Sequence, residues 1–175
     1  MSAQGFEGMS PHELARVEIE AWRGECLDFF GKGQAQIGNL LQLARQAGYR
    51  ATLHERAQDR TVEAVRIADM LSGKTQAEDA SAVLAAWQSL ESRCELLANG
   101  VATETLDREG NWYALFDMVA YRGGGAARGR WTVSRAEAES FLQELEHSLI
   151  LLSQQLGCMC QELGGGAKPR KAQAL

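Results

Sequence analysis

The segment "AESFLQELEHSLILLSQQLGCMCQEL" (Ala138–Leu163) carries the clearest structural signal in the chain. Its apolar residues recur alternately four and three positions apart, which is the seven-residue repeat of a packed helix. Three further apolar side chains, Phe141, Ile150 and Leu151, widen this surface beyond one seam. Such a helix either sits deep in a bundle or packs inward and also against a second subunit. The repeating positions are Ala138, Leu142, Leu145, Leu149, Leu152, Leu156, Met159 and Leu163.

Composition limits the classes of protein to consider. The chain has 175 residues, of which 45% are hydrophobic, and this is enough for one domain with a real core. The net charge is −5, whereas proteins that coat duplex DNA are normally basic, so no duplex DNA partner is expected. No apolar run approaches the length of a membrane span, and "MSAQGFEGMSPHE" lacks the pattern of a secretory signal. We therefore expect no membrane association.

The four cysteines, Cys26, Cys94, Cys158 and Cys160, show no C-x-x-C pair and no histidines at zinc-finger intervals. Reduced thiols in a cytoplasmic protein are the simplest interpretation. The sequence therefore predicts neither a bound metal nor a cofactor.

Upstream of the last helix, the sequence predicts a long first helix. Ser10, Pro11 and Glu13 form a capping box with proline at the first helical position, and Gly48 suits the stop after about Ala47. The glycines of "FGKGQ" are a weak point, since each costs about 0.5–1 kcal/mol relative to alanine. Either Gly33 lets a neighbouring helix approach closely, or the helix breaks near Gly31–Gly33. The predicted inward stripe is Leu14, Val17, Ala21, Cys26, Phe29, Ile37, Leu40 and Ala44.

Two more helices are predicted before the pattern changes. The second runs from about Thr52 to Leu71, and the third follows a capping box at Thr75 and Glu78. Gly100 suits the left-handed position after the third helix. The predicted inward residues are Val62, Val65, Ala68 and Leu71 in the second helix, and Ala80, Val83, Trp87, Leu90, Cys94 and Leu97 in the third.

The next stretch is dense in aromatic and β-favouring residues. "NWYALFDMVAY" (Asn111–Tyr121) and "RWTV" (Arg130–Val133) flank the glycine-rich "RGGGAARG". This predicts a β-hairpin over about residues 112–133, with a short helix over Trp112–Val119 as the alternative. The last helix then starts at a capping box of Ser134 and Glu137.

The fold predicted from these signals is all-α. We expect one elongated bundle of four to five helices with a small β-hairpin before the last helix. It forms a single domain over residues 11–163, between a flexible N-terminus (1–10) and a disordered tail (164–175).

Two motifs suggest chemistry. "ELEH" places Glu144 and His147 on one helical face, but di-iron bundles need this motif twice, so a solvated face is the better interpretation. The hairpin arginines Arg122, Arg128 and Arg130 stand beside Tyr121 and Trp131. Arginines among aromatic residues can grip an RNA strand, although a solvated hairpin tip suits the acidic chain better.

The segment "ESRCELLANG" (Glu91–Gly100) adds a family resemblance. The elements follow in a fixed order: long helices, a helix that ends in Arg-x-x-x-x-x-Asn-Gly, an aromatic hairpin and a capped last helix. This layout, over roughly Val83–Gln155, resembles the higher-eukaryote-and-prokaryote nucleotide-binding, or HEPN, domains. Bacterial members often carry an Arg-Asn-x-x-Ala-His-Gly type sequence, of which "RCELLANG" retains Arg93, Ala98 and Gly100. Asn99 stands where the family has histidine, and Cys94 where a polar residue is usual.

The resemblance implies a homodimeric binding protein. Active members are metal-independent ribonucleases that work as dimers, and histidine can shuttle a proton near neutral pH, whereas asparagine cannot. The resemblance therefore implies a non-catalytic binding or regulatory module, in which Arg93 and Asn99 recognise a nucleotide, RNA or protein partner. The wide last helix is the expected dimer surface.

Two other functions stay open at this stage. A purely structural protein-interaction bundle is the alternative, because Asn-Gly is also an ordinary helix stop. A metal-independent ribonuclease is the third class.

Overall fold

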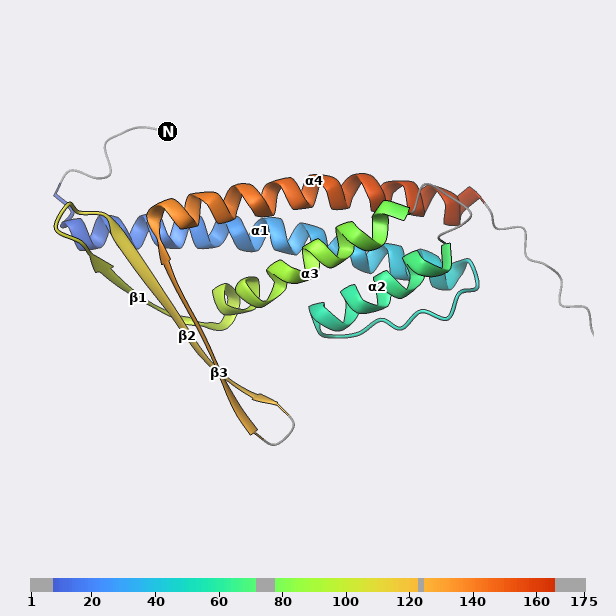
Figure 1. The fold of residues 1–175 in the computed structure, drawn as a ribbon, viewed down its shortest axis with the longest axis horizontal. Helices are drawn as coiled ribbons and strands as arrows, with labels where there is room; N and C mark the ends of the chain where they lie inside the picture. Colours follow the sequence, from blue (N-terminus) through green and yellow to red (C-terminus); the bar gives the residue numbers. More distant parts are fainter. Residues whose placement is uncertain (1–7, 72–77, 123–124, 166–175) are drawn as a thin grey trace, which may run out of the picture. The chain divides into compact units, whose positions relative to one another are not determined.

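The computed structural model describes residues 8–71, 78–122 and 125–165, which form four helices and three strands (Figure 1). Thr75 of the predicted second capping box lies outside these residues, as do most of the predicted flexible N-terminus and tail. In chain order the elements are α1 (Pro11–Gln46), α2 (Ala57–Leu71), α3 (Glu78–Asn99), β1 (Val101–Leu106), β2 (Trp112–Arg122), β3 (Gly125–Ser134) and α4 (Arg135–Gly165).

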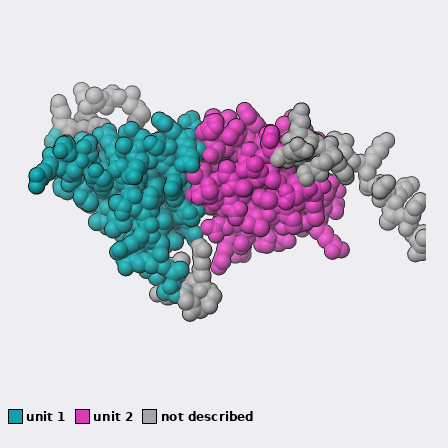
Figure 2. Space-filling model, viewed as in Figure 1, with its two compact units in different colours: residues 1–30, 92–146 teal, residues 31–91, 147–175 magenta. Residues whose placement is uncertain are grey.

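The chain divides into two compact units (Figure 2). Unit 1 comprises residues 1–30 and 92–146, and unit 2 comprises residues 31–91 and 147–175. The helices α1, α3 and α4 therefore contribute residues to both units. None of the described helices combines the length and apolarity that crossing a membrane requires.

The chain is mostly helical, as predicted, but its β part is larger than the predicted hairpin. β2 and β3 form that hairpin, with Trp112–Arg122 in a strand rather than a helix, and β1 adds a third antiparallel strand in the order β1-β2-β3. β1 pairs with only the first half of β2, from Val101↔Asp117 to Leu106↔Trp112. A six-residue edge strand has little local signal of its own, because cross-strand packing provides most of its stability.

The capping boxes at the starts of α1 and α4 are confirmed. Ser10 N–H donates to Glu13 Oε2 at 2.7 Å, and Ser134 N–H donates to Glu137 Oε2 at 2.8 Å. These bonds satisfy backbone donors that the first helical turn leaves without intrahelical partners. At its other end α1 stops before Gly48, whose φ of 89° is the left-handed conformation expected there.

The glycines of "FGKGQ" do not break α1, which continues to Gln46. Within unit 2, a Cβ added to Gly33 would lie 2.2 Å from Trp87 Cζ2 of α3. Trp87 is fully buried. The prediction that Gly33 admits a close neighbouring helix is thereby confirmed, and the neighbour is the indole of Trp87.

The predicted inward face is wrong for the first turns of α1, although Cys26 is buried as predicted. Leu14, Val17 and Ala21 are exposed, and Ala15, Ile19 and Trp22 are buried in their place. The stripe is rotated by one residue because Trp22, which the predicted stripe omits, turns into the aromatic core of unit 1.

α2 begins at Ala57 rather than near Thr52. The backbone N–H of Thr52 donates to Glu63 Oε1 at 2.9 Å. This bond keeps the segment between Thr52 and Ala57 out of the helix. Val62 is exposed, contrary to prediction. The buried face of α2 is Thr61, Ala64, Ile67, Ala68 and Leu71.

The predicted left-handed conformation of Gly100, at the end of α3, is also wrong. Positive φ among the described glycines occurs at Gly8, Gly48 and Gly110, so Gly100 is not left-handed. Its N–H donates to the Leu96 carbonyl at 2.7 Å, and an added Cβ would lie 2.5 Å from that oxygen. Glycine is needed here for close packing and not for backbone conformation.

The heptad pattern of α4 is confirmed at most positions. In unit 1 Ala138 and Leu145 are buried, whereas Leu142 is half-buried. In unit 2 Leu149 is half-buried, and Ile150 and Leu151 are 50% and 38% exposed. The remaining buried heptad residues of α4 are Leu152, Leu156, Met159 and Leu163.

A buried polar cluster joins α1, α2 and α3 inside unit 2. Gln34 Nε2 donates to Glu91 Oε1 at 2.8 Å, and Thr61 Oγ1 donates to the same oxygen at 2.5 Å. Arg60 donates to Gln34 Oε1 from Nε at 3.2 Å and from a terminal nitrogen at 3.0 Å. Glu91 is 1% exposed. Its carboxylate thus fixes the mutual register of three helices through directional bonds that apolar packing alone does not provide.

Gly33→Ala is expected to lower the free energy of unfolding by about 1–3 kcal/mol, the usual cost of overpacking a core. Gly38→Ala is the matched control, because an added Cβ at Gly38 meets nothing within 4 Å. The control should be neutral or stabilising by up to about 1 kcal/mol. Urea denaturation measures both, and equal stability of the two variants would contradict the Gly33–Trp87 contact.

Glu91→Leu is expected to destabilise the protein, because it removes the buried acceptor that Gln34 and Thr61 share and leaves Thr61 only its longer bond to the Ala57 carbonyl. A buried donor that loses its acceptor costs about 1–3 kcal/mol. Glu91→Gln retains an acceptor oxygen and should lose markedly less. Chemical denaturation of both variants tests the cluster, and a Glu91→Leu protein as stable as Glu91→Gln would show that these bonds do not stabilise unit 2.

Candidate functional site

An aromatic cluster forms the centre of unit 1. Trp22 of α1 is 7% exposed, and its Nε1 donates to the carbonyl of Ala138 in α4 at 2.8 Å. The cluster therefore joins α1, α4 and the inner face of the sheet. The four rings around Trp22, with centroid separations of 5.9–6.5 Å, are Trp112, Phe116, Trp131 and Phe141.

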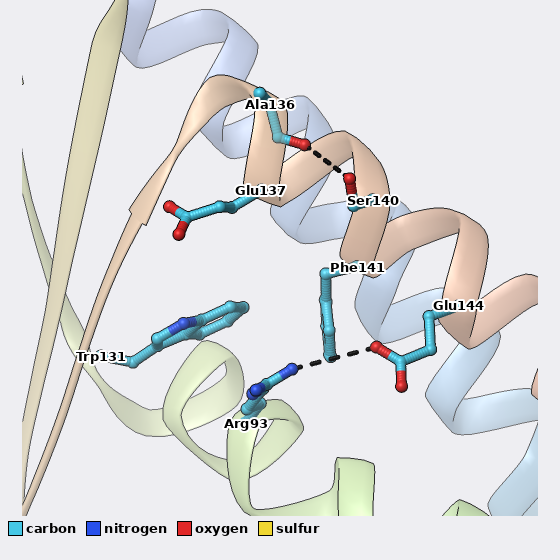
Figure 3. A pocket seen from close by; sticks show the side chains of 7 residues that line it. All are labelled: Arg93, Trp131, Ala136, Glu137, Ser140, Phe141 and Glu144. Carbon is cyan, nitrogen blue, oxygen red and sulfur yellow. Dashed lines mark hydrogen bonds and ion pairs between the residues drawn. The ribbon is translucent and has the colours of Figure 1, made fainter.

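Arg93, in the part of α3 that belongs to unit 1, rests on the outer side of this cluster (Figure 3). Its guanidinium carbon lies 5.5 Å from the ring centroids of both Trp131 and Phe141. These two rings meet edge to face at 5.0 Å. Cation–π attraction of this kind contributes about 0.5–1 kcal/mol at exposed sites. The aromatic rings thus hold the guanidinium in place.

Arg93 lines an open pocket of about 330 Å³. Figure 3 shows Trp131 and Arg93 on one side of the pocket and the first turns of α4 on the other, with Phe141 pointing from α4 toward Arg93. The remaining lining residues are Ala136, Glu137, Ser140 and Glu144. The pocket therefore combines two aromatic rings, one guanidinium and two carboxylates.

The polar groups of α4 in this pocket differ in how they are engaged. Glu137 accepts hydrogen bonds from the backbone and hydroxyl of Ser134, and the backbone bond is the main reason its pKa is lowered. The Ser140 hydroxyl donates to the Ala136 carbonyl at 2.9 Å. Glu144 pairs with Arg93 at 3.9 Å, which is longer than a hydrogen bond.

The guanidinium of Arg93 is therefore held in position, while its hydrogen-bond donors are not used within the described residues. Its side chain is 48% exposed and that of Glu144 is 56% exposed, so their ion pair contributes little in water. Within the described part of the chain, the guanidinium of Arg93 donates no hydrogen bond. Its N–H donors are available to a ligand or partner.

Asn99 does not join Arg93 in this site. Its Nδ2 donates to the Glu95 carbonyl of its own helix at 3.2 Å, and it does not line the pocket. Six positions of an α-helix correspond to about one and two-thirds turns, which places the two side chains on different sides of α3. The two residues that the family resemblance brings together therefore lie apart.

The hairpin arginines form a separate group. Arg128 Nε donates to Asp117 Oδ1 at 2.8 Å, and Arg130 Nε donates to Asp117 Oδ2 at 3.3 Å. Hydrogen bonding from Arg128 is the largest cause that lowers the pKa of Asp117 to about 2. The side chain of Arg122 is not among those that the structure describes.

These arginines project from the other face of the sheet. Arg130 pairs across the strands with Asp117, and Trp131 pairs with Phe116. Successive side chains of a strand point to opposite faces, so Arg128 and Arg130 face outward while Trp131 faces the aromatic cluster. The structure thus brings together Arg93 and Trp131, but not Arg93 and the hairpin arginines.

The remaining candidate chemistry is limited. Glu144 of the "ELEH" motif faces Arg93, and no group of three or more histidine, cysteine or acidic residues that could hold a metal occurs in the described residues. No histidine is among the described residues that line the pocket. Comparison of the chain with protein-family models, curated proteins and solved structures gave no match.

Proposed function

We propose that the protein is a non-catalytic binding module that recognises a protein partner through the pocket of Arg93, Trp131 and Phe141. The observation that carries this proposal is the state of Arg93. Two aromatic rings hold its guanidinium beside an open pocket, and it donates no hydrogen bond among the described residues. Tryptophan and arginine are the residue types that contribute most to binding energy at protein interfaces.

The charges of the pocket favour a protein partner over RNA. Glu137 and Glu144 line it beside a single cation, so the lining carries a net negative charge. A phosphate chain would meet these carboxylates as well as a net protein charge of −5.

The chemistry of the same residues supports binding rather than catalysis. Asn99 cannot take up a proton at neutral pH, and it lies away from Arg93. The Ser140 hydroxyl donates to a backbone carbonyl, and no histidine base lines the pocket. We interpret the resemblance to HEPN domains as similarity to a non-catalytic member of that family.

A photoreactive residue in the pocket tests the proposal. We place p-benzoylphenylalanine at the exposed position Ser140 and irradiate cells that make the protein. Protein adducts should form at Ser140, and Arg93→Ala should suppress them because it removes the positioned donor. The same probe at Glu25, an exposed α1 position in unit 1 outside the pocket, is the matched control.

Three outcomes would count against a protein partner. Adducts that contain RNA and depend on Arg93 would favour the RNA-binding alternative. Equal adducts at Glu25 and Ser140, or adducts that persist in Arg93→Ala, would show that the pocket has no binding role.

We further propose a homodimer through α4. Its support is the exposure of Ile150 and Leu151, which continue the apolar surface of a helix that is otherwise buried on one side. Light scattering at micromolar concentration should give twice the 19.1 kDa chain mass, and Ile150→Glu should shift the protein toward one chain mass. A single chain mass for the unmodified protein at every concentration would refute the dimer.

A further inference from the structure

We propose that the outer edge of β3 receives an extended segment of the partner protein as a further strand. This segment would alternate acidic and apolar residues. The inference rests on the proposed function and specifies how the partner binds.

β3 offers a long edge. It pairs with β2 over ten residue pairs, from Tyr113↔Ser134 to Arg122↔Gly125, and the described part of the chain places no second strand beside it. Among the described residues, no hydrogen bond from outside β2 reaches the backbone of residues 126–133. An edge strand presents alternate N–H and C=O groups that a further strand can bind.

The opposite edge is less suited to this role. β1 has six residues, and its Glu104 already accepts two hydrogen bonds from Arg16 of α1. β3 is therefore the edge with both the length and the available side chains for strand addition.

The inner face of the added strand would meet the pocket. β3 passes directly into α4, and Trp131 of β3 lines the same pocket as the first turns of α4. Figure 3 shows the indole of Trp131 directed toward Arg93 and Phe141. An apolar side chain placed opposite Trp131 on the new strand would extend toward these rings, since cross-strand neighbours share a face.

The outer face of the added strand would meet positive charge. The side chains of Arg128 and Arg130 are 57% and 56% exposed, and they share the single carboxylate of Asp117. Acidic residues opposite these two arginines would neutralise the remaining charge, because opposite charges stabilise directly facing positions. The two faces together give the predicted alternation of acidic and apolar residues.

Two sets of short synthetic peptides test this inference on the full chain. In one set glutamate alternates with varied apolar residues, and in the other lysine replaces every glutamate. Fluorescence anisotropy should show binding of the glutamate set, with the lysine set weaker by about tenfold or more. Arg130→Glu should weaken binding, whereas Arg108→Glu, in the exposed turn after β1, should leave it unchanged.

Backbone methylation separates strand addition from side-chain binding. The best peptide is made in two versions, with alternate amide nitrogens methylated in one register or in the other. Only alternate N–H groups of an added strand face β3, so one version should lose binding and the other should retain it.

Each remaining result overturns the inference in a distinguishable way. Binding that Arg93→Ala abolishes but that neither methylated version changes would refute strand addition and leave the proposed function intact. Preference for the lysine set, or no binding by either set, would refute the predicted partner segment itself.

Discussion

The indole of Trp22 is the contact on which unit 1 depends. It lies among four other aromatic rings, and its single N–H binds the carbonyl of Ala138 near the start of α4. Aromatic pairs of this kind contribute about 0.5–1.5 kcal/mol each beyond the burial of their area. Because Trp131 and Phe141 belong to this cluster, their positions are fixed before any partner arrives. Arg93 therefore rests on packed rings, which would reduce the side-chain ordering that the proposed binding requires.

The arginines of unit 1 show how different Arg93 is from its neighbours. Arg23 donates to the carbonyls of Leu97 and Gly100 at 2.5 and 3.3 Å and so satisfies the end of α3. Arg16 binds Glu104 of β1. These two guanidiniums have structural roles in joining α1 to α3 and to β1. Arg93 donates no such hydrogen bond among the described residues and has only a distant carboxylate beside it, and this difference supports the proposed binding role.

The sequence predicted what depends on neighbouring residues. Capping boxes, the repeat of α4 and the close approach at Gly33 follow from spacing along one helix, so they could be inferred without a structure. The register of α1 could have been corrected locally, since Trp22 continues the spacing of Ile19 and Cys26. Likewise Glu91 interrupts an apolar stripe between Trp87 and Cys94, which marks a buried polar group.

The features that escaped prediction depend on contacts between distant parts of the chain. β1 owes its existence to pairing with β2, and Asp117 acquires its partners only when β3 folds back beside it. The motif that contains Arg93 also contains Asn99, yet helical geometry places these two residues on different sides of α3. Its actual companions, Trp131 and Phe141, come from other elements. The spacing of the motif identifies Arg93 as a candidate, but it does not predict which side chains surround it.

The division of α4 between the two units has a consequence for synthesis. Its buried residues Ala138, Phe141 and Leu145 complete unit 1, and Leu152, Leu156 and Met159 complete unit 2. A nascent chain therefore emerges with α1, α2 and α3 long before either core has its last component. Contacts between early and late segments slow folding and leave apolar surface exposed in the meantime. Ribosome-bound chains that stop before α4 should accordingly expose apolar surface to chaperones. Both cores become complete only when α4 has been made.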